Sequence, residues 1–501
     1  MDKLFNIRVT YSGLISLIIG MATVGIGAVS TIIITRSLSP EEFGTWGLIG
    51  ALTTYVIVIE PIISTWAIRE TARGEKSGKT AVFSSGMFSI VGILAYIVIA
   101  YFVGIQANAN VNLILFSAIL IPFLFLSRTL SVINMGWKPQ AASYGLIGFE
   151  ISKIPAGLAF VYFLDMGLQG AIIATVFAYS ISIGILLYQA KEKIMVPLKK
   201  EFLIKWIKLS WLALYTGRIY SMIQHFDVAV FSLIVGNVVG LAYWSSAFAI
   251  SSVVAHSSAV SEGLYGKLLG GSKKEYFQEN FRLVLYFIIP LFAFVITFAR
   301  PGLFTLNPIY ETAVLVVIFL AVHMLVQTFS NIFDAALKGI EKVDLNEKAS
   351  LKDYTKSSLF YLPTLTIIQR GTYITSLAIV LFLSLGKSDL ELVINWSIVA
   401  AVVPIPFMFY RLILVRKNFT IKINYYIILK YVITASLVFG ITYVLMDEYL
   451  TYNEQIILFF PQVLLYVIFS VGGYLAITFF IDTNTKQLIK AIFNELKSIQ
   501  K

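Results

Sequence analysis

The chain alternates between long apolar runs and short polar connections. Fourteen of the runs are long enough to cross a bilayer, since a spanning helix needs about 20 apolar residues. The pattern therefore predicts an all-α polytopic membrane protein with fourteen transmembrane helices. They are expected at about 10–35, 42–66, 80–105, 111–134, 140–163, 167–189, 208–235, 240–266, 281–300, 311–337, 358–386, 390–412, 425–446 and 455–481.

The seventh run differs from the others because polar residues interrupt it, namely Arg218, Gln224, His225 and Asp227. A charge at the centre of a lipid-facing helix costs about 3 kcal/mol on insertion scales, so such side chains normally face protein or a water-filled cavity. Arg218 and His225, seven residues apart, share one helix face, and Asp227 falls near the opposite face. We expect this helix to line a polar path through a transporter.

Composition supports a membrane protein. Of the 501 residues, 58% are hydrophobic and 13% are charged, against roughly 45–50% and 25% in soluble domains. The absence of cysteine excludes disulfides, thiolate metal sites and thiol catalysis. No loop is long enough for a catalytic domain and no catalytic or metal-binding motif is present, so we expect neither an enzyme nor a bound cofactor or metal.

The net charge of +11 is explained by the positions of the basic residues rather than by nucleic-acid binding. With the N-terminus in the cytoplasm, all but six of the 38 lysines and arginines fall in cytoplasmic loops, in the termini or towards the cytoplasmic ends of spans, as the positive-inside rule requires. We therefore expect both termini in the cytoplasm of a multi-pass cell-membrane protein. The six exceptions are Arg36, Arg300 and Lys387 on the outer side, and Lys153, Arg218 and Arg370 within spans.

A cytoplasmic segment divides the core of the chain. We expect an N-terminal six-helix bundle at 1–189, a linker at 190–207, a second six-helix bundle at 208–412, and helices 13 and 14 with a tail at 413–501. A short repeat relates the two bundles, because the link between spans 1 and 2 (RSLSPEEFGTWGLIGALTTY) matches that between spans 7 and 8 (SLIVGNVVGLAYWSSAFAIS). Gly44 then corresponds to Gly240. Parallel repeats of this kind are common in alternating-access transporters.

Polar residues inside the spans are the candidates for function. Arginine stays protonated and suits phosphate, so Arg218 and Arg370 are expected to be cavity-lining cations unless acids on other helices pair with them. Glu150 and Lys153 share a face at i, i+3, so they form either a self-neutralising pair or part of the site. His256 and His323 are more typical of hydrogen-bonded interior residues than of proton carriers, and Asp334 is expected at the cytoplasmic interface. The candidate substrate-binding residues are Arg218, Arg370, Lys153, His225, Gln224 and Gln369, and the candidate ion-coupling residues are Asp227, Glu60, Glu150 and His256.

Several motifs resemble those of the multidrug/oligosaccharidyl-lipid/polysaccharide (MOP) exporter superfamily, most closely its polysaccharide transporter branch, the O-antigen-type flippases of lipid-linked oligosaccharides. They are RSLSPEEFG from Arg36, Asp227 with the glycines and Tyr243 that follow it, MGLQGAIIATVFAY from Met166, and NPIYETAVLVVIFLA from Asn307. The resemblance implies two six-helix bundles in a V around a central cavity, with two further helices that cradle a lipid tail. It also implies a cationic cavity for the phosphate and glycan, a role that Arg218, Arg370 and Lys153 match by location.

These observations predict a flippase for polyprenyl-(pyro)phosphate-linked oligosaccharides that serves cell-surface glycan synthesis. The expected partners are the lipid-linked oligosaccharide, membrane lipids, H⁺ or Na⁺, and glycan-assembly proteins. The alternative is a cation-coupled drug or small-solute antiporter of the same superfamily, in which an acidic cavity is expected. A scaffold or polymerase subunit is a third hypothesis, but the short external loops argue against it.

Overall fold

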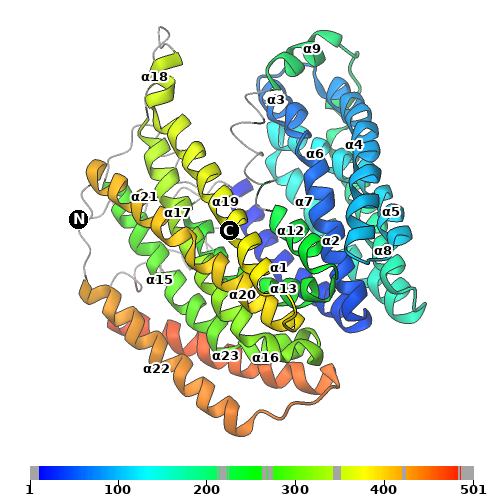
Figure 1. Ribbon diagram of the computed structural model, residues 1–501. Coiled ribbons are helices and arrows are strands. Elements are labelled where there is room, and N and C mark those ends of the chain that lie inside the picture. Colours follow the sequence, from blue (N-terminus) through cyan, green and yellow to red (C-terminus); the bar gives the residue numbers. More distant parts are fainter. Residues whose placement is uncertain are drawn as a thin grey trace. The chain divides into compact units, whose positions relative to one another are not determined.

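The computed structural model describes residues 11–210, 214, 223, 225–261, 264, 268, 275–341, 343, 351–419, 425–482 and 486. All regular elements in these ranges are helices (Figure 1). The chain forms two compact units. The first consists of Arg8–Ser245 and Thr366–Val393, and the second mainly of Ser246–Leu365 and Ile394–Lys501. The predicted domain boundaries and the V-shaped cavity stay predictions.

The first unit contains most of the N-terminal helices. They are α1 (Tyr11–Ser37), α2 (Pro40–Ile57), α3 (Pro61–Ala72), α4 (Gly78–Gln106), α5 (Val111–Phe116), η1 (Ser117–Ile119), α6 (Leu120–Trp137), α7 (Pro139–Gly157), η2 (Leu158–Phe163), α8 (Gly167–Ile194), α9 (Lys200–Lys208) and α12 (Phe226–Val235). Three helices have residues in both units, namely α13 (Val239–Ser251), α19 (Ser358–Leu383) and α20 (Asp389–Val402).

The second unit contains the remaining elements. They are η3 (Ser252–Ser261), α15 (Glu275–Thr297), α16 (Ala299–Leu306), η4 (Pro308–Ala313), α17 (Val314–Gly339), α18 (Leu351–Lys356), α21 (Pro404–Asn418), α22 (Tyr425–Tyr449) and α23 (Ile456–Ile481).

The described helices confirm a multi-pass membrane protein. Eleven are long and apolar enough to cross a membrane, or twelve if the bent pair α2 and α3 is one span. Two predicted spans, 10–35 and 208–235, are represented by the shorter apolar helical segments Gly25–Ser37 and Phe226–Val235. Because part of the second of these spans lies outside the described residues, the count of fourteen stays a prediction.

The second predicted span, 42–66, is not one straight helix. It breaks at Glu60, and α2 and α3 meet at a bend of 63°. Pro61 opens α3, and proline suits a first helical position because it has no N–H group to leave unsatisfied there. The hydrophobic run is continuous across the bend, so hydropathy alone could not show it.

The predicted linker, 190–207, is largely helical. α8 continues to Ile194, and α9 begins at Lys200. A Cβ atom on Gly78 would lie 2.2 Å from the Lys193 carbonyl oxygen, so the end of α8 is in close contact with the start of α4. This part of the chain is therefore built into the first unit.

Both glycines of the sequence repeat are close-packing positions in the first unit. A Cβ atom on Gly44 would lie 1.9 Å from the Val238 carbonyl oxygen, and one on Gly240 would lie 2.3 Å from the Phe231 ring. Glycine lets backbone or a ring approach closely at such points. The helix starts differ in detail, because Ser39 caps α2 five residues before Gly44 whereas the Asn237 side chain accepts a bond from Val239.

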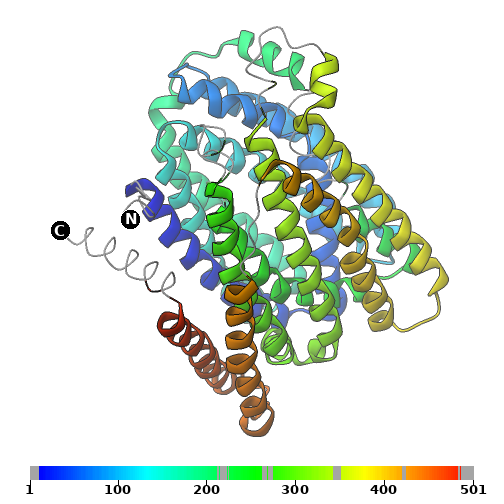
Figure 2. The ribbon, with the colours of Figure 1, turned by 90° about the vertical axis from the view of Figure 1, so that its left-hand side faces the viewer.

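Helices α22 and α23 form a pair in the second unit, and α22 also packs on α15 (Figures 1 and 2). Their shared core is rich in aromatic residues. Tyr286 and Thr478 share a hydrogen bond of 3.1 Å between their hydroxyl oxygens. Tyr474 donates to the Tyr286 carbonyl oxygen over 3.1 Å, and Tyr431 donates to Asp482 over 2.8 Å. Satisfied hydroxyls of this kind hold the pair to the unit.

Candidate functional site

A buried carboxylate lies at the start of α12 in the first unit. Asp227 is 7% exposed. Its Oδ1 accepts a hydrogen bond from the Val228 N–H group over 2.8 Å, and its Oδ2 accepts one from the Tyr373 hydroxyl of α19 over 2.9 Å. Buried carboxylates need such partners because burial removes their water. The bond from Tyr373 therefore connects α12 to α19.

Arg370 lies one helical turn before Tyr373 and is 4% exposed. It is close enough to His225 and Asp227 to interact electrostatically with both. Gln369, the neighbouring residue, is 2% exposed. The structure thus brings together three sequence-predicted candidates, Arg370 of α19 with His225 and Asp227 at the start of α12, and it gives Arg370 an acidic neighbour on another helix.

Tyr55 of α2 completes this cluster and was not predicted. Its hydroxyl donates a hydrogen bond to the His225 carbonyl oxygen, and its ring stacks on Phe226 at a centroid distance of 5.1 Å. Aromatic residues are common in the apolar runs of membrane proteins, so the sequence did not indicate that Tyr55 would be part of a polar site. We call Tyr55, His225, Asp227, Arg370 and Tyr373 the polar cluster.

Glu150 and Lys153 form an ion pair on α7, with Oε2 and Nζ 2.6 Å apart. This confirms the pairing suggested by their spacing. The side chains are 14% and 21% exposed, respectively. A Cβ atom on Gly27 of α1 would lie 3.4 Å from Glu150 Oε2, and Lys153 Nζ lies 4.9 Å from the centroid of the Phe149 ring. Lys153 is therefore a neutralised cation in this structure.

Glu60 lies at the bend between α2 and α3 and is 1% exposed. Its Oε2 accepts a hydrogen bond from the Ser64 hydroxyl over 3.2 Å. The structure places this carboxylate at the end of two helices rather than within one.

Three polar residues in the second unit have clear positions. His256 is exposed in η3, which differs from the interior position expected for it. His323 is an interior histidine as predicted, with Nδ1 2.6 Å from the Ala400 carbonyl oxygen. Asp334, which was expected at the cytoplasmic interface, forms an ion pair in which Arg411 Nε donates to its Oδ1 over 2.8 Å. Arg411 is 1% exposed, although the charge count assigned it to a cytoplasmic loop.

Other candidates fall outside the described residues, namely Arg218 and Gln224. Within the described ranges, no group of three or more histidines or acids is arranged to hold a metal ion.

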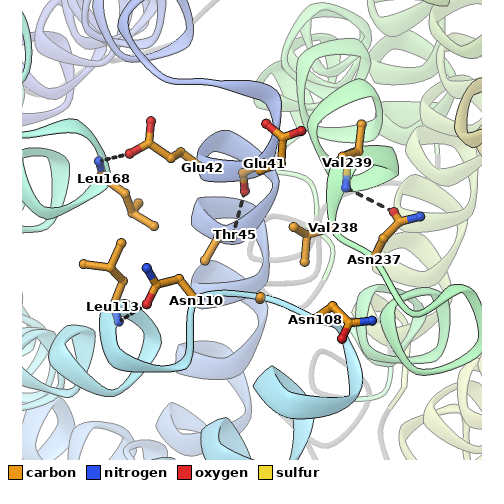
Figure 3. A pocket seen from close by; sticks show the side chains of 11 residues that line it. Glu41, Glu42, Thr45, Asn108, Asn110, Leu113, Leu168, Asn237, Val238 and Val239 are labelled. Carbon is orange, nitrogen blue, oxygen red and sulfur yellow. Dashed lines mark hydrogen bonds between the residues drawn. The ribbon is translucent and has the colours of Figure 1, made fainter.

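A pocket of about 290 Å³ lies at another part of the first unit (Figure 3). Its carboxylate Glu42 makes two backbone contacts, with Oε1 3.1 Å from the Leu168 nitrogen and Oε2 3.1 Å from the Ser39 nitrogen. Ser39 Oγ accepts in return from the Glu42 N–H group, which forms a capping box. Glu41, Asn108 and the other lining residues come from α2, the α4–α5 loop, α5, α8, the α12–α13 loop and the start of α13. The motif from Arg36 to Gly44 thus has a structural role at helix starts.

Comparison with solved structures defines the class of fold. The fold of this chain is similar to the folds of a lipid flippase and of multidrug transporters whose structures are solved. One similar structure is that of the lipid II flippase MurJ in an inward closed conformation, with a TM-score of 0.68, 15% identity, and coverage of 95% of this chain and 100% of that chain. Another is the inward-facing conformation of a multidrug resistance MATE family transporter of the MOP superfamily. It has a TM-score of 0.60, 15% identity, and coverage of 81% of this chain and 98% of that chain.

A MATE structure in a straight conformation matches less well, with a TM-score of 0.51 and 16% identity over 80% of this chain and 94% of that chain. No protein-family model matches the sequence, and no curated protein matches it. At these identities the likeness concerns the fold.

Proposed function

We propose that this protein is a flippase that moves a polyprenyl-phosphate- or pyrophosphate-linked oligosaccharide across the cytoplasmic membrane by alternating access, with both termini in the cytoplasm. The observation that carries the proposal is the extent of the match to the lipid II flippase, which covers 95% of this chain. The multidrug transporter match covers 81%, so about a fifth of this chain has no counterpart in that structure. A lipid-linked substrate gives a reason for the additional helices.

The pair α22 and α23 offers apolar surface to such a substrate. Leu437 and Ile441 on α22, and Leu465 and Ile468 on α23, are exposed. A polyprenyl tail gains nothing by leaving the hydrocarbon, so a flippase needs to move only the polar head while the tail stays against apolar surface. We assign the tail to this pair.

The polar head needs a path of its own. Its charges and hydroxyls would lose their hydrogen bonds in hydrocarbon, and an arginine can replace them with charge-assisted bonds to phosphate. Arg370 is the described candidate for this role, with Arg218, Lys153, Gln224, Gln369 and His225 as further candidates. Because Asp227 is an acidic neighbour of Arg370, the phosphate and Asp227 compete for the guanidinium group.

This competition supplies a coupling scheme. A proton or Na⁺ at Asp227 neutralises the carboxylate and weakens its attraction for Arg370, so Arg370 then binds phosphate more strongly. Loss of the cation restores the attraction and favours release. Glu60 and His256 remain candidates for ion coupling, whereas Glu150 is already neutralised by Lys153.

A cation-coupled antiporter for drugs or small solutes is the second candidate. A specific observation favours it, because buried Asp227 is a carboxylate on which a cation could act, and multidrug transporters share the fold. In that case the carboxylate, rather than Arg370, would be needed for substrate binding.

The test is leaflet translocation in proteoliposomes that contain a lipid-linked oligosaccharide. Arg370→Ala and Arg218→Ala should each slow translocation by about 10- to 100-fold, the loss expected for a charged hydrogen bond of roughly 1.5–3 kcal/mol. Arg370→Lys should restore part of the rate because it keeps the charge. Arg300→Ala, which removes an exposed arginine paired with Glu311, is the control and should be near wild type. If wild-type protein moves no lipid-linked sugar but exports a cationic dye, the antiporter is correct.

A further inference from the structure

Helix α9 crosses one end of the first unit, where α8 finishes and α4 begins (Figure 1). The backbone N–H group before the helix, at Lys199, donates to Thr80 Oγ1 over 3.0 Å. The inner face is anchored by Trp206, which is fully buried in a cluster with Ile63 and Ala67. Lys205 Nζ also lies 2.7 Å from Glu70 Oε1 of α3. α9 is thus held in one orientation.

The outer face of α9 combines apolar and basic side chains. Lys200, Ile204, Ile207 and Lys208 have the spacing i, i+4, i+7, i+8, which places them on one side of a helix. Ile204 is 54% exposed and Ile207 is 50% exposed. No segment in the described part of the chain covers these two isoleucines, and a lysine lies at each end of the apolar pair.

The surroundings of α9 extend this pattern. Exposed Met195 and Leu198 precede the helix. The segment from residue 190 to residue 208 is rich in lysine and has only two acids, Glu192 and Glu201. A short helix with an apolar face bordered by lysines is typical of the interface between headgroups and acyl chains. Because α9 crosses the end of helices long enough to span the bilayer, the headgroup layer is the environment expected there. The lysines of the segment are Lys191, Lys193, Lys199, Lys200, Lys205 and Lys208.

We propose that α9 is an interfacial helix that binds anionic phospholipid headgroups. Ile204 and Ile207 insert into the acyl-chain boundary, and Lys200 and Lys208 contact the phosphates on either side. The occupant is the anionic bilayer surface rather than a soluble protein, because the exposed isoleucines and the lysines together complement both parts of a lipid. Through Lys205 and Glu70, the end of α3 is thereby tied to the membrane surface.

The test uses the full-length protein in nanodiscs and a single bimane label. The chain has no cysteine, so Ile204→Cys gives one labelling site. Quenching by brominated phosphatidylglycerol is compared with quenching by brominated phosphatidylcholine, and the ratio gives the relative binding constant for anionic lipid at α9. We expect a ratio well above one. Lys200→Gln with Lys208→Gln should lower it about ten- to thirtyfold, since each lysine near an anionic surface contributes about fivefold.

The matched control is Arg416→Gln with Lys417→Gln, which removes the same charge from exposed positions at the end of α21 in the second unit. It should leave the ratio unchanged. Ile207→Asn should reduce quenching by both lipids and keep the ratio, and gel filtration checks that each variant is folded. A wild-type ratio near one, or an equal fall in the control, overturns the proposal. So does a label that neither lipid quenches and that aqueous iodide cannot reach, since protein would then cover α9.

Discussion

The interaction between Asp227 and Arg370 makes a quantitative prediction for stability. Both side chains are buried, at 7% and 4% exposure, and groups that interact across a buried site show coupling free energies of about 0.5–3 kcal/mol. Asp227 keeps the bonds from Tyr373 and Val228, so Arg370→Met should destabilise by about 1–3 kcal/mol. Asp227→Asn removes the negative charge with which Arg370 interacts and should cost about as much.

The double variant should be more stable than the sum of the two losses predicts, by about 0.5–3 kcal/mol, because the interaction between the two charges is then lost only once. Unfolding in mixed micelles by sodium dodecyl sulfate, followed by tryptophan fluorescence, measures the three free-energy changes against wild type. Asp227→Asn combined with Arg411→Met is the control pair, since Arg411 is paired with Asp334, and its effects should add. Additivity within about 0.5 kcal/mol for Asp227 and Arg370 would show that the two do not interact.

Two further predictions concern packing and a second buried charge. Gly44→Ala should destabilise the protein by about 3 kcal/mol or more, because the new methyl group would meet the Val238 carbonyl oxygen. Gly50→Ala, with open space around it, should instead stabilise α2 by about 0.5–1 kcal/mol. Thermal unfolding measures both, and equal shifts of the midpoint would contradict the packing argument. Arg411→Met should lower the free energy of unfolding by about 3–5 kcal/mol, because Asp334 then keeps a charge without Arg411. If this charge is the cause, the double variant Arg411→Met with Asp334→Asn should lose less stability than Arg411→Met alone. An equal loss would point to packing instead.

The positions of the helices could be predicted because a membrane span is a local property of about 20 residues. The bend at Glu60 could not, since hydropathy contains no information about helix direction. Arg411 shows another limit. Near the end of an apolar run it looks like an interfacial base, and only tertiary packing brings it to Asp334, 77 positions away.

The candidate site was predictable in its members but not in its arrangement. Asp227 and Arg370 stand out because charges are rare in apolar runs. Their proximity depends on how α12 packs against α19, which no spacing along the chain encodes. Tyr55 joins them through a hydroxyl bond to a backbone carbonyl, and nothing about an isolated tyrosine predicts such a contact. The buried position of Arg370 also changed its interpretation, from a lone cation to one with an acidic neighbour.

The break between α2 and α3 interrupts the helical backbone within a single apolar run. α2 contacts α4, α6, α8 and α12, and α3 contacts α4, α6 and α9, so of the two only α2 touches α12 and only α3 touches α9. An unbroken helix is a stiff rod that transmits a displacement along its whole length, because each turn is hydrogen-bonded to the next. Here the rod is interrupted at Glu60, so a shift of α12 can be absorbed at the joint before it reaches α3. A tilt of α2, the half next to the polar cluster, would therefore not be transmitted to α3 through a continuous helix.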